Sequence, residues 1–256
     1  MNTAKKVFEI LDYILRHPDG VTANVLSKAL GMSLPNVYKY LSTLESLGVL
    51  MKKDDRKYVG GFKLLEYGSA VLRNLDVREI AHPHLVDLLA KTDQTVHMVV
   101  KDGFEGVYVE KLESARSLPM VSRIGMRIPL YCTAVGKSIL SYLPKREMEE
   151  YFSSVKFEKR TEHTIVDPTE LLKELEKTRI KGYAVDREEN ELGVACVGAP
   201  ILNHDGYPVA GVSISGVAKR VLPKIEKYGE IIKEYAARIS KLLGYREKED
   251  ENARHS

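Results

Sequence analysis

The chain has 256 residues, of which 44% are hydrophobic and 29% charged, a composition typical of a globular protein with one large domain or two ordinary ones. No run without Asp, Glu, Lys or Arg exceeds thirteen residues, whereas a transmembrane helix needs roughly 20 apolar residues. Charged side chains also interrupt the N-terminal segment in which a signal peptide would have its apolar core. We therefore expect a cytoplasmic protein with no membrane partner.

The small net charge of +3 is concentrated at the N-terminus. Residues 1–62 contain nine Lys and Arg side chains against six Asp and Glu, so the remaining residues contain 30 of each. A local excess of this size is also found on ordinary solvated surfaces. It favours an anionic partner for this segment when other features agree.

Three short helices are predicted in the N-terminal segment. Residues 3–17 carry apolar side chains at helical spacing and end at a turn. A two-turn helix over residues 23–30 follows, with Thr22 as its N-cap and Gly31 closing it. The third helix runs from Ser33, its N-cap, to residue 47. Two short helices joined by a glycine-containing turn form a helix-turn-helix motif.

The third helix has one apolar and one polar face. The spacing of its apolar residues predicts a buried stripe made of Val37, Leu41, Leu44 and Leu47. A polar helix face is often only solvated, and some winged helices bind only proteins. Beside a basic hairpin, however, this face is suited to base edges in the major groove of duplex DNA. We expect DNA contacts from Ser33, Asn36, Tyr38, Lys39, Ser42 and Thr43.

A small hairpin, or wing, is predicted directly after the third helix. Leu50 and Tyr58 lie on its two strands, and residues 54–56 form its turn. Basic side chains at the tip of such a wing reach phosphates or the minor groove. We expect these contacts from Lys52, Lys53, Arg56 and Lys57.

The spacing of apolar residues after the wing predicts a linker helix and a second domain. Residues 62–75 form an apolar-striped helix, which we interpret as a linker between domains or subunits. Helices alternate with strands from residue 77, which predicts an antiparallel sheet with helices packed against it. The predicted domains are a DNA-binding domain (1–62), a linker helix (63–75), a second domain (76–246) and a mobile tail (247–256).

Elements of the second domain follow from periodicity and turn residues. We expect helices over residues 77–92, 133–144, 168–182 and 222–244, and strands over 96–103, 106–113, 194–203 and 208–216.

Three stretches resemble the IclR family of bacterial transcriptional regulators. They are GMSLPNVYKYLSTLESLGVL with the following KYVGGFKLLEYG, RIGMRIPLYCTAVGKSILSYLP at 123–144, and GYAVDREENELGVACVGAPILNHDGYPVAGVSISG at 182–216. The resemblance implies an α+β protein: a winged helix-turn-helix, a linker helix and a C-terminal effector-binding domain like GAF and PAS sensors. Pro35 and Asn36 replace the small hydroxyl residues that the family usually has there, so the operator sequence does not carry over.

The resemblance also implies partners and a site. Such regulators are homodimers, often paired into tetramers, that bind a small metabolite, commonly an organic acid or an aromatic compound. Because a dimer has twofold symmetry, we expect its operator to be near-palindromic. We expect a repressor that requires no cofactor. The positions that carry over to the effector site are Met120, Ala134, Val135, Asp186, Cys196, Ser213 and Ser215.

The residues themselves are compatible with this site. Ser213 and Ser215 are two apart on a strand and so share one face, although alternating serines usually mark a half-exposed face. Cys196 in an apolar strand is usually an inert core thiol, and Asp186 lies in a charged run typical of a surface.

Two other functions were weighed. A cysteine hydrolase would need a histidine partner, and the seven histidines form no recognisable signature. A zinc ion held by Asp186, Cys196 and a histidine such as His97 is an alternative, whereas residues 82–84, HPH, are interpreted as the start of a helix. The second domain would then sense a metal, or would serve only for oligomerisation and protein contacts.

Overall fold

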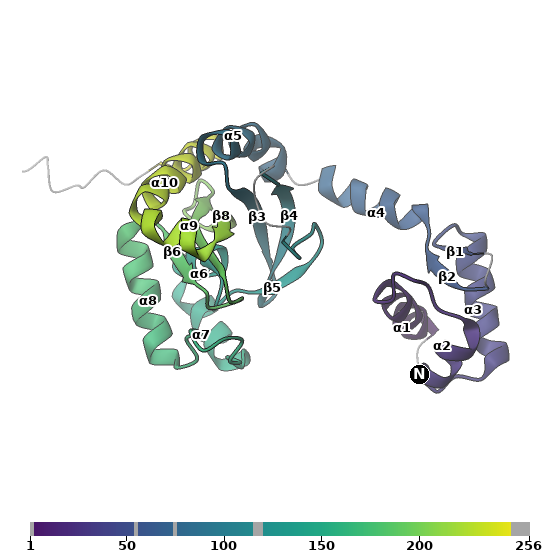
Figure 1. The fold of residues 1–256 in the computed structure, drawn as a ribbon. Coiled ribbons are helices and arrows are strands. Elements are labelled where there is room, and N and C mark those ends of the chain that lie inside the picture. The colour runs from purple at the N-terminus through teal and green to yellow at the C-terminus, as the bar shows by residue number, and fades with distance from the viewer. Residues whose placement is uncertain (1–2, 54–55, 74–75, 115–119, 247–256) are drawn as a thin grey trace, which may run out of the picture. The chain divides into compact units, whose positions relative to one another are not determined.

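The computed structural model describes residues 3–53, 56–73, 76–114 and 120–246, with the side chains of residues 72 and 73 excepted. The chain divides into two compact units, Met1–Leu75 and Asp76–Ser256 (Figure 1). The predicted tail over 247–256 lies outside the described residues.

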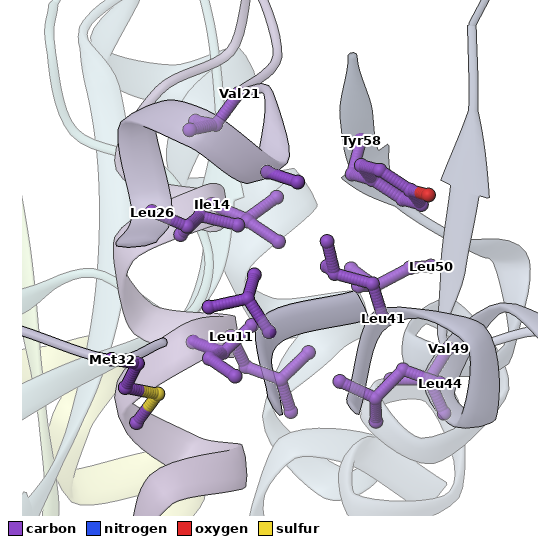
Figure 2. Close-up of a cluster of buried hydrophobic side chains, with 13 residues drawn as sticks. Leu11, Ile14, Val21, Leu26, Met32, Leu41, Leu44, Val49, Leu50 and Tyr58 are labelled. Carbon is purple, nitrogen blue, oxygen red and sulfur yellow. The ribbon is translucent and has the colours of Figure 1, made fainter. Parts of the chain in front are cut away.

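The first unit begins with three helices around an apolar core. These are α1 (Thr3–Leu15), α2 (Ala23–Leu30) and α3 (Leu34–Ser46), as predicted. Figure 2 shows leucines from all three helices facing one another, with Val21 and Tyr58 closing one side. Gly31 takes the left-handed conformation, with φ of 61°, that ends α2 and turns the chain toward α3.

Two details of α2 and α3 differ from the prediction. Ser33 and Thr22 occupy N-cap positions, but neither side chain makes a capping hydrogen bond. Leu47 is 60% exposed, so its assignment to the buried stripe was wrong. The reason is that α3 ends at Ser46 and Gly48 turns the chain with φ of 72°. The buried stripe therefore stops at Leu44.

The wing and the linker helix complete the first unit. The antiparallel strands β1 (Leu50–Lys52) and β2 (Tyr58–Gly60) form the wing, and Tyr58 also pairs with Val21. Residues 54 and 55 of the predicted turn lie outside the described part. The following helix is α4 (Phe62–Arg73).

The second unit contains a six-stranded antiparallel sheet in the order β5-β4-β3-β8-β7-β6. The α+β class with a winged helix-turn-helix and an antiparallel sheet is thereby confirmed. The strands of this sheet are β3 (Thr95–Asp102), β4 (Glu105–Leu112), β5 (Arg127–Pro129), β6 (Ala184–Arg187), β7 (Val194–Leu202) and β8 (Pro208–Val217).

Helices pack on both faces of this sheet. The helices of the second unit are α5 (Asp76–Thr92), α6 (Ala134–Leu140), α7 (Lys145–Ser154), α8 (Pro168–Lys181), α9 (Ala218–Val221), the 3-10 turn η1 (Leu222–Lys224) and α10 (Ile225–Leu242). The start of α6 lies directly against Gly198 of β7, where an added Cβ would be 2.7 Å from the Val135 amide nitrogen. On the other face, Gly229 of α10 lies against the Tyr183 ring beside β6.

Some elements were not predicted from the sequence. Strands β5 and β6 have three and four residues, too few for a period of two to be recognised. Helix α7 was also missed. Pro83 lies inside α5 rather than at its start, so the interpretation of HPH was wrong. His82 instead lies in mid-helix, where its side chain is half exposed and its Nδ1 is 3.1 Å from Glu110 Oε2 of β4.

Candidate DNA-binding surface and ligand cavity

The polar face of α3 is open to solvent. Val37 and Leu41 on the other face are fully buried, which fixes the rotation of the helix about its axis. The Thr43 hydroxyl donates to the Lys39 carbonyl at 2.9 Å, whereas that of Ser33 makes no capping bond. All six predicted DNA-contacting residues are exposed, namely Ser33, Asn36, Tyr38, Lys39, Ser42 and Thr43.

The wing displays a cluster of positive charge. Lys52, Lys53 and Arg56 are exposed, and Lys57 is half-buried. Arg56 has φ of 60°, and its amide donates to the Lys53 carbonyl at 3.1 Å, so the hairpin reverses here. Lys52 Nζ lies 5.8 Å from the Tyr58 ring centroid. Exposed cations on a hairpin of this kind are suited to phosphate contacts.

Strand register gathers the predicted effector residues on one face of the larger sheet. Asp186 of β6 pairs with Cys196 of β7, and Cys196 pairs with Ser215 of β8. The neighbouring row places Ser213 beside His97 of β3. Directly paired residues point to the same face, so side chains from four strands converge there.

A cavity of about 70 Å³ lies over these rows, several times the roughly 10–15 Å³ that one water molecule needs. All seven predicted positions line it: Met120, Ala134, Val135, Asp186, Cys196, Ser213 and Ser215. Their convergence is a fact of the geometry, and their role in binding stays a prediction.

His97 is a cavity residue that the predicted effector set did not contain. Its Nδ1 lies 3.2 Å from Ser215 Oγ, and its Nε2 lies 2.8 Å from Ser122 Oγ. Burial, reinforced by the charge of Lys111, lowers the pKa of His97 to about 3. The imidazole is therefore neutral and donates to one serine while accepting from the other. The signal for this site was the polar pair Thr95 and His97, which alternates with the apolar residues of the first half of β3.

Asp186 is 3% exposed and accepts a hydrogen bond from the Glu189 amide at 2.7 Å. Burial, with a smaller effect from the nearby Glu189 carboxylate, raises the pKa of Asp186 to about 7. A substantial fraction of this carboxyl is thus protonated at neutral pH and available as a donor.

The thiol of Cys196 is not an activated nucleophile. Burial, followed by the charge of Asp186, raises its pKa. Within the described ranges, no group of three or more His, Cys, Asp and Glu side chains is placed to hold a metal ion. The zinc alternative therefore has no donor set among those residues.

Comparison with known proteins identifies the chain's family. A profile for the IclR helix-turn-helix domain matches residues 3–54, and one for the bacterial transcriptional regulator IclR C-terminal region matches residues 69–241. The chain belongs to the IclR family. Members of this family are transcriptional regulators rather than enzymes, so the chain is a DNA-binding regulator.

Three relatives illustrate the similarity. The transcriptional regulator KipR of Bacillus subtilis is 35% identical over 244 residues, which cover 95% of this chain and 97% of KipR. The crystal structure of Thermotoga maritima IclR is 53% identical, with a TM-score of 0.83 over 96% of this chain and 100% of that one. The repressor BlcR of Agobacterium tumefaciens is 30% identical, with a TM-score of 0.61 over 95% and 97% of the two chains.

No helix within the described ranges of this IclR-family chain is long and apolar enough to cross a membrane.

Proposed function

We propose that this regulator is a repressor whose affinity for its operator changes when a small organic acid binds in the cavity beneath α6. The observation that carries the proposal is the convergence of the seven predicted residues, with His97, on one cavity. Repression is supported by BlcR, which is described as a repressor. A protein whose partner is the operator would act in the cytoplasm.

Backbone amides favour a carboxylate at one end of the cavity. The first-turn amides of α6 belong to Ala134 and Val135, which line the cavity. Gly198 has no side chain, so α6 approaches the sheet closely here, and Ser213, the strand partner of Gly198, lines the same cavity as these two residues. Amide and hydroxyl donors together suit a carboxylate oxygen.

The other end of the cavity favours a hydroxyl or hydrated carbonyl. Asp186 would repel a second carboxylate when it is ionised, but its protonated form donates a hydrogen bond. Cys196 and Ser215 lie in the same row. We therefore propose a ligand that carries a carboxylate at one end and an oxygen substituent beside Asp186.

The regulator is further proposed to act as a dimer, and pairs of dimers would form a tetramer. Exposed apolar side chains on α4 support this, with Phe62, Leu65 and Val71 exposed by 71, 66 and 63%. The sequence predicted dimer contacts around Leu65, Leu72 and Leu75, of which the side chain of residue 72 and the whole of residue 75 lie outside the described part. A twofold protein requires a near-palindromic operator with half-sites roughly 34 Å apart, or a multiple of that distance.

Operator titration tests the sensing role. A panel of organic acids is first screened by melting-temperature shift. The hit should change operator affinity roughly 5- to 150-fold, the usual range of allosteric coupling. A Ser213→Ala, Ser215→Ala double variant should bind the operator as before but lose this response, because the hydroxyls that hold the acid are gone.

Ser153→Ala is the matched control, since this exposed serine of α7 lies away from the cavity and its hydroxyl donates only to a carbonyl of the same helix. It should keep both operator binding and the response. Undiminished binding of the acid by the double variant would place the ligand elsewhere.

A further inference from the structure

A buried ion pair lies just outside the cavity lining. Lys137 of α6 is 0% exposed, and its Nζ is 2.5 Å from Oε1 of Glu189, which is 4% exposed. The other carboxylate oxygen, Oε2, is buried and has no hydrogen-bond partner among the described residues. Two charges removed from water in this way are each costly unless they stay together.

The pair joins two walls of the cavity. Lys137 lies on the helix that contributes Ala134 and Val135 to the lining. Glu189 belongs to the turn after β6, and its amide donates to Asp186 Oδ1 at 2.7 Å. The Glu189 carbonyl accepts from Thr164 Oγ1 at 2.6 Å, which holds the turn from behind.

Charge balance makes this pair important for an anionic ligand. Asp186 and Glu191 line the cavity, whereas no Lys or Arg side chain does so among the described residues. Lys111, whose charge acts on His97, is itself paired with Glu113, with Nζ 2.5 Å from Oε1. Lys137 lowers the pKa of Asp186, and Glu189 raises it, so both charges act on the cavity wall. Without Lys137, the uncompensated Glu189 carboxylate would lie next to Asp186.

We propose that Lys137 is a positioning residue of the ligand cavity: its ion pair with Glu189 fixes the turn that carries Asp186 against α6 and offsets the negative charge there, so that the cavity accepts an anion. The inference rests on the proposed function, because it concerns the anionic ligand class of the same site.

Cys196 supplies a readout that does not require the natural effector. Its thiolate displaces iodide from iodoacetate, an anion, and from iodoacetamide, a neutral molecule of similar size. Both reactions need the thiolate, so the ratio of the two rates does not depend on the thiolate fraction. The ratio instead measures the preference of the cavity for a carboxylate. Because burial raises the pKa of the Cys196 thiol, the reactions are run at alkaline pH with a large excess of reagent. Rates at Cys196 are followed by peptide mass spectrometry, after treatment with EDTA and beside N-acetylcysteine as a free-thiol reference.

We expect the iodoacetate-to-iodoacetamide ratio of the wild-type protein to exceed that of the free thiol. Lys137→Met should lower the ratio on the order of tenfold, as one uncompensated charge within roughly 10 Å does at an effective dielectric constant of about 20. Glu189→Gln should raise it. The Lys137→Met, Glu189→Leu double variant, which removes both charges, should return it toward the wild-type value.

Lys145→Met is the matched control, because this lysine of α7 is 91% exposed, and it should leave the ratio unchanged. Circular dichroism checks that each variant is folded. Loss of packing alone would affect both reagents alike and would not give opposite changes in Lys137→Met and Glu189→Gln.

The outcomes separate the two proposals. A wild-type ratio no higher than that of the free thiol would contradict the anionic ligand itself. A raised wild-type ratio that neither single variant changes would overturn the role of Lys137 while leaving the anion site standing. If Lys137→Met does not fold, Glu189→Gln and the double variant decide the question: an unchanged ratio in Glu189→Gln would overturn the proposal.

Discussion

At the scale of single residues, the carboxyl of Asp186 has the most testable property. Burial raises its pKa to about 7 from an ordinary value near 3.8. Between these values the folded protein binds more protons at this site than the unfolded chain, so stability falls as pH rises from about 4 to about 7. Asp186→Asn should remove this loss, with a gain over wild type at pH 8 on the order of 2–4 kcal/mol, measured by urea unfolding at several pH values. The amide oxygen of asparagine still accepts from Glu189.

The control for this prediction is Glu176→Gln, an exposed carboxyl of α8. Its stability should run parallel to that of the wild type over the whole pH range. An Asp186→Asn curve that also stays parallel would mean that this carboxyl titrates at an ordinary pKa in the folded protein.

At the scale of elements, α3 and the wing are expected to divide the work of DNA recognition. Neutralising Lys52, Lys53 and Arg56 to Gln removes three phosphate contacts, so the slope of log K against log salt concentration should become shallower by about 2–3. Asn36→Ala should instead change which operator bases are preferred, because α3 reaches base edges. Fluorescence anisotropy over a salt series, with a library of operator sequences, measures both effects.

Lys173→Gln on α8, an exposed lysine of the second unit, should leave the slope unaltered. Equal salt slopes for the wing variant and the wild type would remove the wing from the DNA contacts.

At the scale of the whole molecule, the exposed apolar side of α4 is expected to be covered by a second copy. Leu65→Glu would place a charge in that interface and should weaken dimerisation about 100-fold or more. Light scattering over a concentration series should then show monomers where the wild type is dimeric, and affinity for a near-palindromic operator should fall with it.

Ile180→Glu changes a residue of α8 that is 86% exposed, and it should keep the dimeric mass. A wild-type protein that is a stable monomer at working concentration would contradict the dimer, whatever Leu65→Glu does.

The sequence by itself determined the local elements and the family. The spacing of Val37, Leu41 and Leu44 predicted an amphipathic helix, and Gly31 marked the turn before it, because helix period and backbone freedom are local properties. The alternation of Ser213 and Ser215 likewise fixed which side chains share a face. Resemblance to the IclR family then supplied the seven positions of the predicted effector site.

Only the tertiary structure decided which of these residues meet and how they are charged. Strand register brings Asp186 beside Cys196 and sets His97 next to Ser213, across pairings up to 116 residues apart in sequence. The pKa values of Asp186 and His97 depend on burial, and the partnership of Lys137 with Glu189 depends on how α6 packs against the turn after β6. Long-range pairing and desolvation arise from the packed molecule, and no local pattern records them.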